Sequence, residues 1–182
     1  MSTPEPPYTE HADPEGVQAA VLLSHVLEAL DGAGASVCRS FVVPGLSVPW
    51  DECCPCSNYR EGQAWVRISQ VQATDAFPGG AGPHRCAPKQ YAVDLAVGVL
   101  RCAHTIDDAG NAPSASTITD DAGKVSRDRA ILRDAIIGPY FGDLEPGDAV
   151  LRTWSPLGPS GGCVGGEWTL ATRVMAPRNP LA

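Results

Sequence analysis

Three cysteines within four positions, Cys53, Cys54 and Cys56, are the residues of this chain best suited to chemistry. Zinc takes four soft ligands in a tetrahedral array, usually from two knuckles of C-x2-C type. Because three thiols this close together cannot all reach one ion with relaxed geometry, we expect no metal site and no cofactor. We expect these thiols to pack a loop against a sheet, as small hydrophobic side chains do.

A small zinc-binding adaptor module built on this loop is the alternative from a different functional class. Its candidate ligands are Cys53, Cys54, Cys56, His84 and Cys86. This alternative predicts stoichiometric zinc in protein purified without added metal, because a structural zinc ion is bound as the chain folds.

Nucleophilic catalysis by a cysteine would need a base and a group that orients that base. The four histidines, at positions 11, 25, 84 and 104, have no spacing that links them to a cysteine. We expect His25 to be a surface or boundary residue of a helix. We therefore predict no catalytic residue and no enzymatic activity.

Two further stretches have only a superficial likeness to ligand sites. Residues 161–166 (GGCVGG) lack the Lys-Ser/Thr ending of a phosphate loop and precede a strand, so we expect a hairpin turn. Asp107, Asp108 and Asn111 lack the Glu that completes an EF-hand loop. Neither stretch predicts a ligand.

The meaning of the cysteine count depends on the cellular compartment. No apolar run approaches the roughly 18 residues that cross a bilayer. The N-terminal sequence MSTPEPPYTEHADPEG has neither the basic nor the apolar region of a signal peptide. We therefore expect the chain to fold in a cytoplasm, where an odd number of cysteines, seven here, favours free thiols or a metal site over a disulfide framework.

The formal charge of −8 at pH 7 restricts the possible partners. Nucleic-acid binding needs clustered Lys and Arg, and this chain has only 13 such residues, scattered along it. We therefore expect neither DNA nor a membrane surface to bind the protein.

The chain divides into a flexible N-terminal arm at 1–12, one domain at 13–176 and a C-terminal tail at 177–182. The domain is predicted to be α+β, with a mixed or mostly antiparallel sheet of about four to six strands packed against two main helices. Long connections rich in glycine and proline are expected, because these two residues make up about a fifth of the chain.

The first helix is predicted to begin after Asp13, a favourable N-cap that precedes Pro14. Gly32 and Gly34 predict its end. Its apolar residues recur three and four positions apart, which predicts a helix that lies on a sheet. The predicted stripe is Val17, Ala20, Val21, Leu23, Leu27 and Leu30, with Gln18, His25 and Glu28 away from it.

The second helix is predicted over 119–137, with Thr119, Asp120 and Asp121 as caps and Gly138-Pro139 as the stop. The stripe predicted to be buried is Ala122, Val125, Leu132, Ile136 and Ile137. The residues predicted to face outward are Arg127, Asp128 and Arg133.

Strands are predicted over 36–43, 64–73, 91–102, 146–154 and 166–176 from their alternating apolar residues. In the second strand, Val66 and Ile68 are placed on one face. Trp65, Arg67 and Val71 are placed on the other face. In the third strand, one face is Tyr91, Val93, Leu95, Val97 and Val99, and the small residues of the opposite face suggest close approach by another layer.

Three stretches of the sequence together form a recognisable pattern. They are VLEALDG at 26–32, WDECCPC at 50–56 followed by GQAWVRISQVQATDAFP at 62–78, and CAPKQYAVDLAVGVLRCAHT at 86–105. Together with the order of elements, they resemble neck proteins of long-tailed bacteriophages of actinobacteria, and among these the tail terminators. The resemblance extends from about residue 14 to residue 176.

The resemblance implies a structural virion protein, assembled in the host cytoplasm, that forms a hexameric ring on the tail tube. Such a ring terminates the tube and joins it to the head connector. The implied partners are copies of the same chain, the major tail tube protein and the head-side connector or stopper protein, with DNA only passing through the channel. A head-completion adaptor, a stopper or a minor tail protein is the alternative within this class.

Overall fold

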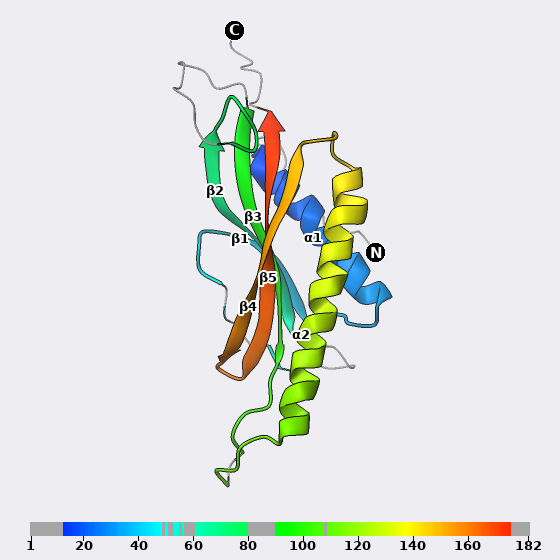
Figure 1. The fold of residues 1–182 in the computed structure, drawn as a ribbon, viewed down its shortest axis with the longest axis vertical. Coiled ribbons are helices and arrows are strands. Elements are labelled where there is room, and N and C mark those ends of the chain that lie inside the picture. The colour runs from blue at the N-terminus through cyan, green and yellow to red at the C-terminus, as the bar shows by residue number, and fades with distance from the viewer. Residues whose placement is uncertain are drawn as a thin grey trace, which may run out of the picture.

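The computed structural model describes residues 13–48, 50, 53–54, 56, 61–79, 90–107 and 109–175. In this part of the chain, two helices and a π-helical turn accompany one five-stranded mixed sheet (Figure 1), so the predicted α+β fold is confirmed. The elements are α1 (Pro14–Gly32), β1 (Arg39–Pro44), β2 (Gln63–Ala73), β3 (Gln90–Cys102), α2 (Ala115–Ala135), η1 (Ile136–Tyr140), β4 (Ala149–Ser160) and β5 (Cys163–Met175).

The proposed arm at 1–12, the tail at 177–182 and most of the Gly/Pro-rich stretch at 77–88 lie outside the described residues. His84 and Cys86 also lie outside them. No helix in the described part of the chain combines the length and the apolar character needed to cross a membrane.

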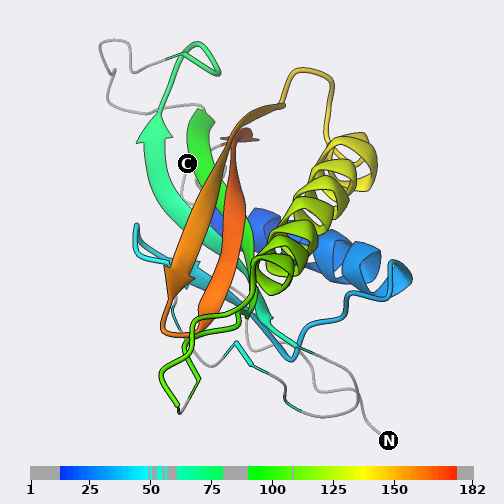
Figure 2. The ribbon, with the colours of Figure 1, turned by 60° about the horizontal axis from the view of Figure 1, so that its bottom comes forward.

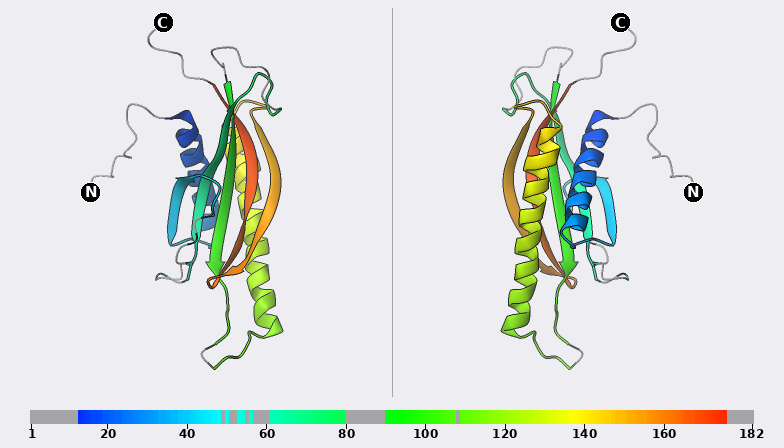
Figure 3. Two further views of the ribbon diagram at one scale, coloured as in Figure 1. Left: turned by 90° about the vertical axis from the view of Figure 1, so that its left-hand side faces the viewer. Right: turned by 90° about the vertical axis from the view of Figure 1, so that its right-hand side faces the viewer.

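The sheet has the strand order β1-β2-β3-β5-β4. β1 runs parallel to β2, and the other neighbours are antiparallel. Both helices cover the same face of the sheet (Figures 2 and 3), where α1 contacts mainly β2 and α2 contacts mainly β5. We call this face the helix face and the opposite one the outer face.

The main core lies between the helices and the helix face. As predicted, Val93, Leu95, Val97 and Val99 all point into it from β3. Fully burying each such side chain contributes about 1.5–3 kcal/mol. The buried helix residues that meet them are Ala19, Leu22, Leu23, Val26 and Leu30 of α1, with Leu132 and Ala135 of α2 and Ile136 and Tyr140 of η1.

α1 begins as predicted, because the Asp13 carboxylate accepts hydrogen bonds from the N–H groups of Glu15 and Gly16. Its buried stripe differs from the prediction, since Val17 is 47% exposed. The reason is that α1 packs against η1 as well as the sheet. Gln18 therefore accepts a hydrogen bond from the Tyr140 hydroxyl at 3.0 Å.

The prediction for α2 was wrong in both its start and its buried face. The helix begins at Ala115 with Ser114 as N-cap, so Asp120 and Asp121 lie inside it. Asp128, predicted to face outward, is buried, whereas Ile137 is 53% exposed. Apolar periodicity missed this because the inward face of the first two-thirds of α2 carries Asp121 and Asp128, which are bonded to partners distant in sequence.

Two details of the strands also differ from the prediction. A bulge between Ile68 and Gln70 shifts the register of β2, so Val71 lies opposite Val93 on the helix-face side rather than beside Trp65. β4 and β5 form one long hairpin whose turn is only Gly161-Gly162, both with positive φ (58° and 78°). Asn-Gly and Gly-Gly pairs favour this turn because both positions need left-handed backbone.

Candidate functional site

One end of the sheet gathers all the described cysteines. Cys102 ends β3 and lies opposite Cys163, the first residue of β5. Cys38 immediately precedes β1, and the connection from β1 to β2 supplies Cys53, Cys54 and Cys56. We call this end of the sheet the disulfide end.

Three disulfides form at the disulfide end: Cys38–Cys56, Cys53–Cys163 and Cys54–Cys102. Their Cα–Cα distances of 5.9, 5.9 and 4.5 Å suit such bonds. The expectation of free thiols was therefore wrong for six of the seven cysteines. That expectation was based on the presumed reducing compartment. The bonded cysteines are 18, 110 and 48 residues apart in sequence, so the sequence alone did not indicate that the fold brings them together.

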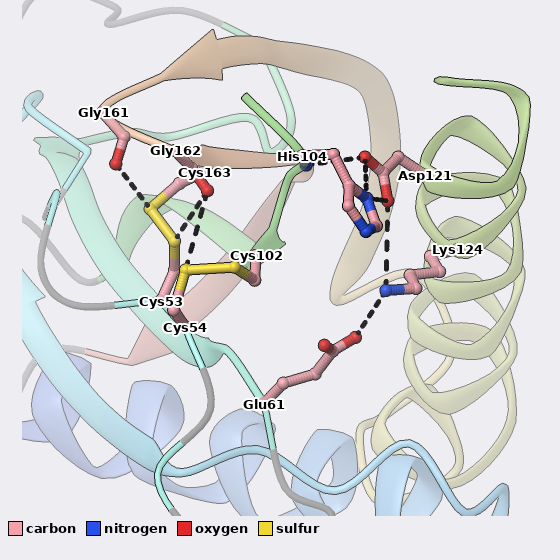
Figure 4. Close-up of a disulfide and its surroundings, with 10 residues drawn as sticks. All are labelled: Cys53, Cys54, Glu61, Cys102, His104, Asp121, Lys124, Gly161, Gly162 and Cys163. Atoms are coloured by element: carbon pink, nitrogen blue, oxygen red, sulfur yellow. Dashed lines mark hydrogen bonds and ion pairs between the residues drawn. A yellow bond between two sulfur atoms is a disulfide. The ribbon is translucent and has the colours of Figure 1, made fainter. Parts of the chain in front are cut away.

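The disulfides hold the β1–β2 connection over a second, smaller core on the outer face. This core contains Cys53, Trp65, Leu100 and Cys163, all buried. The Cys53 sulfur also lies 3.5 Å from the carbonyl oxygen of Gly162 in the hairpin turn (Figure 4). The prediction that the cysteine loop packs against the sheet thus describes its position, although the sulfurs are bonded to one another.

The candidate zinc ligands do not converge within the described structure. Cys53, Cys54 and Cys56 belong to three separate disulfides, and a disulfide sulfur is not the thiolate that zinc binds. Among the described residues, no group of three or more His, Cys, Asp or Glu side chains could hold a metal ion. His84 and Cys86 fall outside these residues.

A charged cluster lies beside the disulfides, between the end of β3 and the first half of α2 (Figure 4). The Asp121 carboxylate accepts a hydrogen bond from the backbone N–H of His104 at 2.9 Å and lies 3.1 Å from its ring Nδ1. Lys124 Nζ lies 3.2 Å from Glu61 and 3.9 Å from Asp121. This cluster joins α2 to the segments after β3 and before β2, and sequence reasoning had missed it.

Burial by itself would raise the pKa of Asp121. The hydrogen bonds from His104, together with the charges of His104 and Lys124, outweigh burial and hold the pKa of this carboxyl below its usual 3.8. Asp121 therefore stays ionised at neutral pH and can orient the His104 ring.

An Asp–His pair can serve a nucleophile, because the carboxylate sets the orientation of the base. Cys102 is two residues from His104, but its sulfur is bonded to Cys54. None of the six described cysteines retains a thiol that His104 could activate. The arrangement supports a structural tie between β3 and α2 more directly than a catalytic role.

The buried side chain of Arg101 stabilises the same region through an ion pair and hydrogen bonds to the backbone. Its buried guanidinium pairs with Asp128 of α2, with the Nε–Oδ2 distance at 2.7 Å. It also donates to the carbonyl oxygens of Ala35 and Glu61 at 2.7 and 2.6 Å. One side chain thus connects β3, α2, the α1–β1 connection and the segment that enters β2.

A scan against protein-family models finds no match to this chain, and a search of the curated proteins finds no similar sequence.

Proposed function

We propose that this chain is a structural protein of a bacteriophage neck, which forms a ring, expected to be hexameric, on the end of the tail tube. The ring would terminate the tube and join it to the head-side connector. The proposal rests on the motifs at 26–32, 50–78 and 86–105. One structural observation supports it most: the two edge strands of the sheet, β1 and β4, are unlike each other and end the sheet without a further partner among the described strands.

Two unlike edges favour a head-to-tail contact between copies. Repeated head-to-tail contacts form a closed ring when the rotation from one copy to the next brings the last copy back to the first. Main-chain groups on an edge strand can bind a strand from another chain. β4 leaves its first half, Ala149–Ser155, free of proline, whereas Pro156 and Pro159 block pairing farther along. The first half of β4 is therefore the better edge for a neighbour.

The disulfide end suits a protein that must stay rigid in a virion. Disulfides persist at virion surfaces, although they are rare in the cytoplasm in which the particle is expected to assemble. We therefore expect the chain to be assembled with reduced cysteines and to become oxidised after release. The acidic net charge of −8 suits a channel lining that lets DNA pass without holding it.

The first experiment is addition of the purified protein to polymerising major tail tube protein, with tube lengths measured by negative-stain electron microscopy. We expect shorter tubes whose ends carry a ring, and rings of about six copies in the protein alone. Tubes of unchanged length with bare ends would contradict the terminator role. Binding only to the isolated head connector would identify the adaptor or stopper alternative instead.

A further inference from the structure

A projection extends beyond the disulfide end of the sheet (Figures 1 and 3). We define it as residues 103–107 and 109–120, which comprise the connection after β3 and the first turns of α2. Ile106 is 67% exposed and Ile118 is 58% exposed on it. Large exposed apolar side chains can contribute to a contact surface where charged groups beside them give that surface complementarity.

Local hydrogen bonds connect the described residues of the projection to one another. The Asp107 carboxylate accepts from the backbone N–H groups of Ala109 and Asn111 at 3.0 and 2.8 Å, and from the Asn111 side chain at 3.0 Å. These bonds hold the pKa of Asp107 below its usual value. The His104–Asp121 pair fixes the base of the projection to α2. The projection therefore presents two apolar side chains, Ile106 and Ile118, and the acidic side chains Asp107 and Asp120.

A surface of complementary character lies farther along α2. Four of the 13 basic residues of the chain fall within the ten positions 124–133. Of these, Arg129 and Arg133 are exposed and one helical turn apart, so they share a flank of the helix. Beside them, Trp168 donates its indole N–H to the Arg129 carbonyl oxygen at 3.0 Å, and its ring lies 5.6 Å from that of Trp154.

Both indoles are only partly buried, so this surface offers two Trp and two Arg side chains together. These two residue types are over-represented among the side chains that dominate binding at protein interfaces. We call Arg129, Arg133, Trp154 and Trp168 the receiving surface. Arg133 already pairs with Asp134 at the surface, so Arg129 is the base of this surface that can face an acidic side chain of the projection. The two indoles can face its isoleucines.

A single molecule cannot join these two surfaces to each other. Ile118 and Arg129 belong to one continuous helix and are therefore held about 16 Å apart along its axis. The group that binds each surface must therefore come from another molecule. A second copy of the chain has both a projection and a receiving surface, so it can bind either one.

We propose that the projection of one copy docks on the receiving surface of the next, head to tail. This inference rests on the proposed ring and names the contact that would close it. The receiving surface includes Trp154 of the edge strand β4. Each copy uses one surface toward each neighbour, as a ring requires.

Charge reversal on the two surfaces tests the contact. Asp120→Lys and Arg129→Glu should each weaken self-association at least about tenfold at low ionic strength, because each brings like charges together. The double variant Asp120→Lys/Arg129→Glu should recover association to within about threefold of the natural chain. An equal mixture of the two single variants should recover it as well, since the contacts in an alternating ring are all complementary.

Association is measured by sedimentation velocity over a range of concentrations, with Glu28→Lys of α1 as the control for a reversed exposed charge. Thermal unfolding of each variant shows that it is folded. Single variants that associate like Glu28→Lys would overturn the contact. So would a double variant no better than the weaker single variant, or a natural chain that stays monomeric throughout.

The tube-length experiment separates this inference from the proposed function. If the natural chain and both single variants shorten tubes equally, the neck function stands and the contact is wrong. If the natural chain associates and the charge reversals behave as expected, but no protein shortens tubes, the contact stands and the terminator role is wrong.

Discussion

Gly98 and Trp65 lie opposite each other on β3 and β2, on the outer face. A Cβ atom at Gly98 would overlap the Trp65 ring and crowd the Cβ of Glu167. The small residues of this face had suggested close approach by another layer. At Gly98 the approaching group is the indole of the neighbouring strand, which fills the space that a side chain would take.

Gly98→Ala should therefore lower the free energy of unfolding by about 1–3 kcal/mol, the usual cost of overfilling a packed site. Gly123→Ala is the matched control, because Gly123 lies within α2 and a Cβ there meets nothing within 4 Å. The control should raise the free energy of unfolding by up to about 1 kcal/mol, since alanine favours helix over glycine. Urea unfolding measures both, and equal effects of the two changes would contradict the packing argument.

Asp121 gives a pH-dependent prediction, because its pKa is lower in the folded protein than the ordinary 3.8. When folding lowers the pKa of a carboxyl group, that group stabilises the fold at every pH above its pKa in the unfolded chain. This stabilisation is lost as the pH falls through its pKa in the folded protein. Asp121→Asn should thus be less stable than the natural chain above about pH 4. The difference should shrink at more acid pH. Unfolding curves across this range test the point, and a constant difference at every pH would contradict it.

Among the elements, α2 depends on polar contacts for its first two-thirds and on apolar burial for its last third. Asp121 and Asp128 face inward in the first two-thirds, whereas Leu132 and Ala135 join the main core in the last third. Arg101 of β3 supplies the partner of Asp128, so the placement of the helix depends on a buried ion pair. Removing one member leaves the other charge buried without compensation.

Arg101→Met should therefore cost about 3–5 kcal/mol of unfolding free energy, and Arg101→Met/Asp128→Leu should cost less than the single change. Arg133→Met is the control, because Arg133 pairs with Asp134 at the surface, where such pairs contribute about 0–1 kcal/mol. Chemical denaturation of dilute protein measures all three. A double variant less stable than Arg101→Met would show that the charge left at Asp128 is not the main cost.

For the molecule as a whole, the disulfides connect segments that are far apart in sequence. Cys53–Cys163 joins the β1–β2 connection to the hairpin of β4 and β5, across 110 residues. Cys38–Cys56 closes a loop of only 18. Because a cross-link restricts the unfolded chain more when the closed loop is longer, the two bonds should differ in their contributions.

Cys53→Ser/Cys163→Ser should lower the free energy of unfolding by about 4 kcal/mol, and Cys38→Ser/Cys56→Ser by about 3 kcal/mol. The value of about 4 kcal/mol takes account of Cys54–Cys102, which stays intact in this variant. With that bond closed, Cys53–Cys163 closes a loop of about 60 residues rather than the whole segment between the two cysteines. Loss of Cys53–Cys163 should also make Trp65 more accessible, because the covering connection loses its tie to β5. Denaturation and quenching of tryptophan fluorescence measure these effects. Equal losses of stability and unchanged quenching would contradict the argument.

Local signals in the sequence were enough to determine most of the elements. The Asp13-Pro14 start of α1, the alternating faces of β3 and β5 and the α+β class all follow from spacing and capping, which act over a few residues. The start and the buried polar face of α2, the side of Val71 and the pairing of the cysteines did not follow. Asp128 needs Arg101, Val71 depends on a bulge against β3, and Cys53 needs Cys163. Only the tertiary structure decides these features, because each partner lies on a different element and no local pattern records which elements become neighbours.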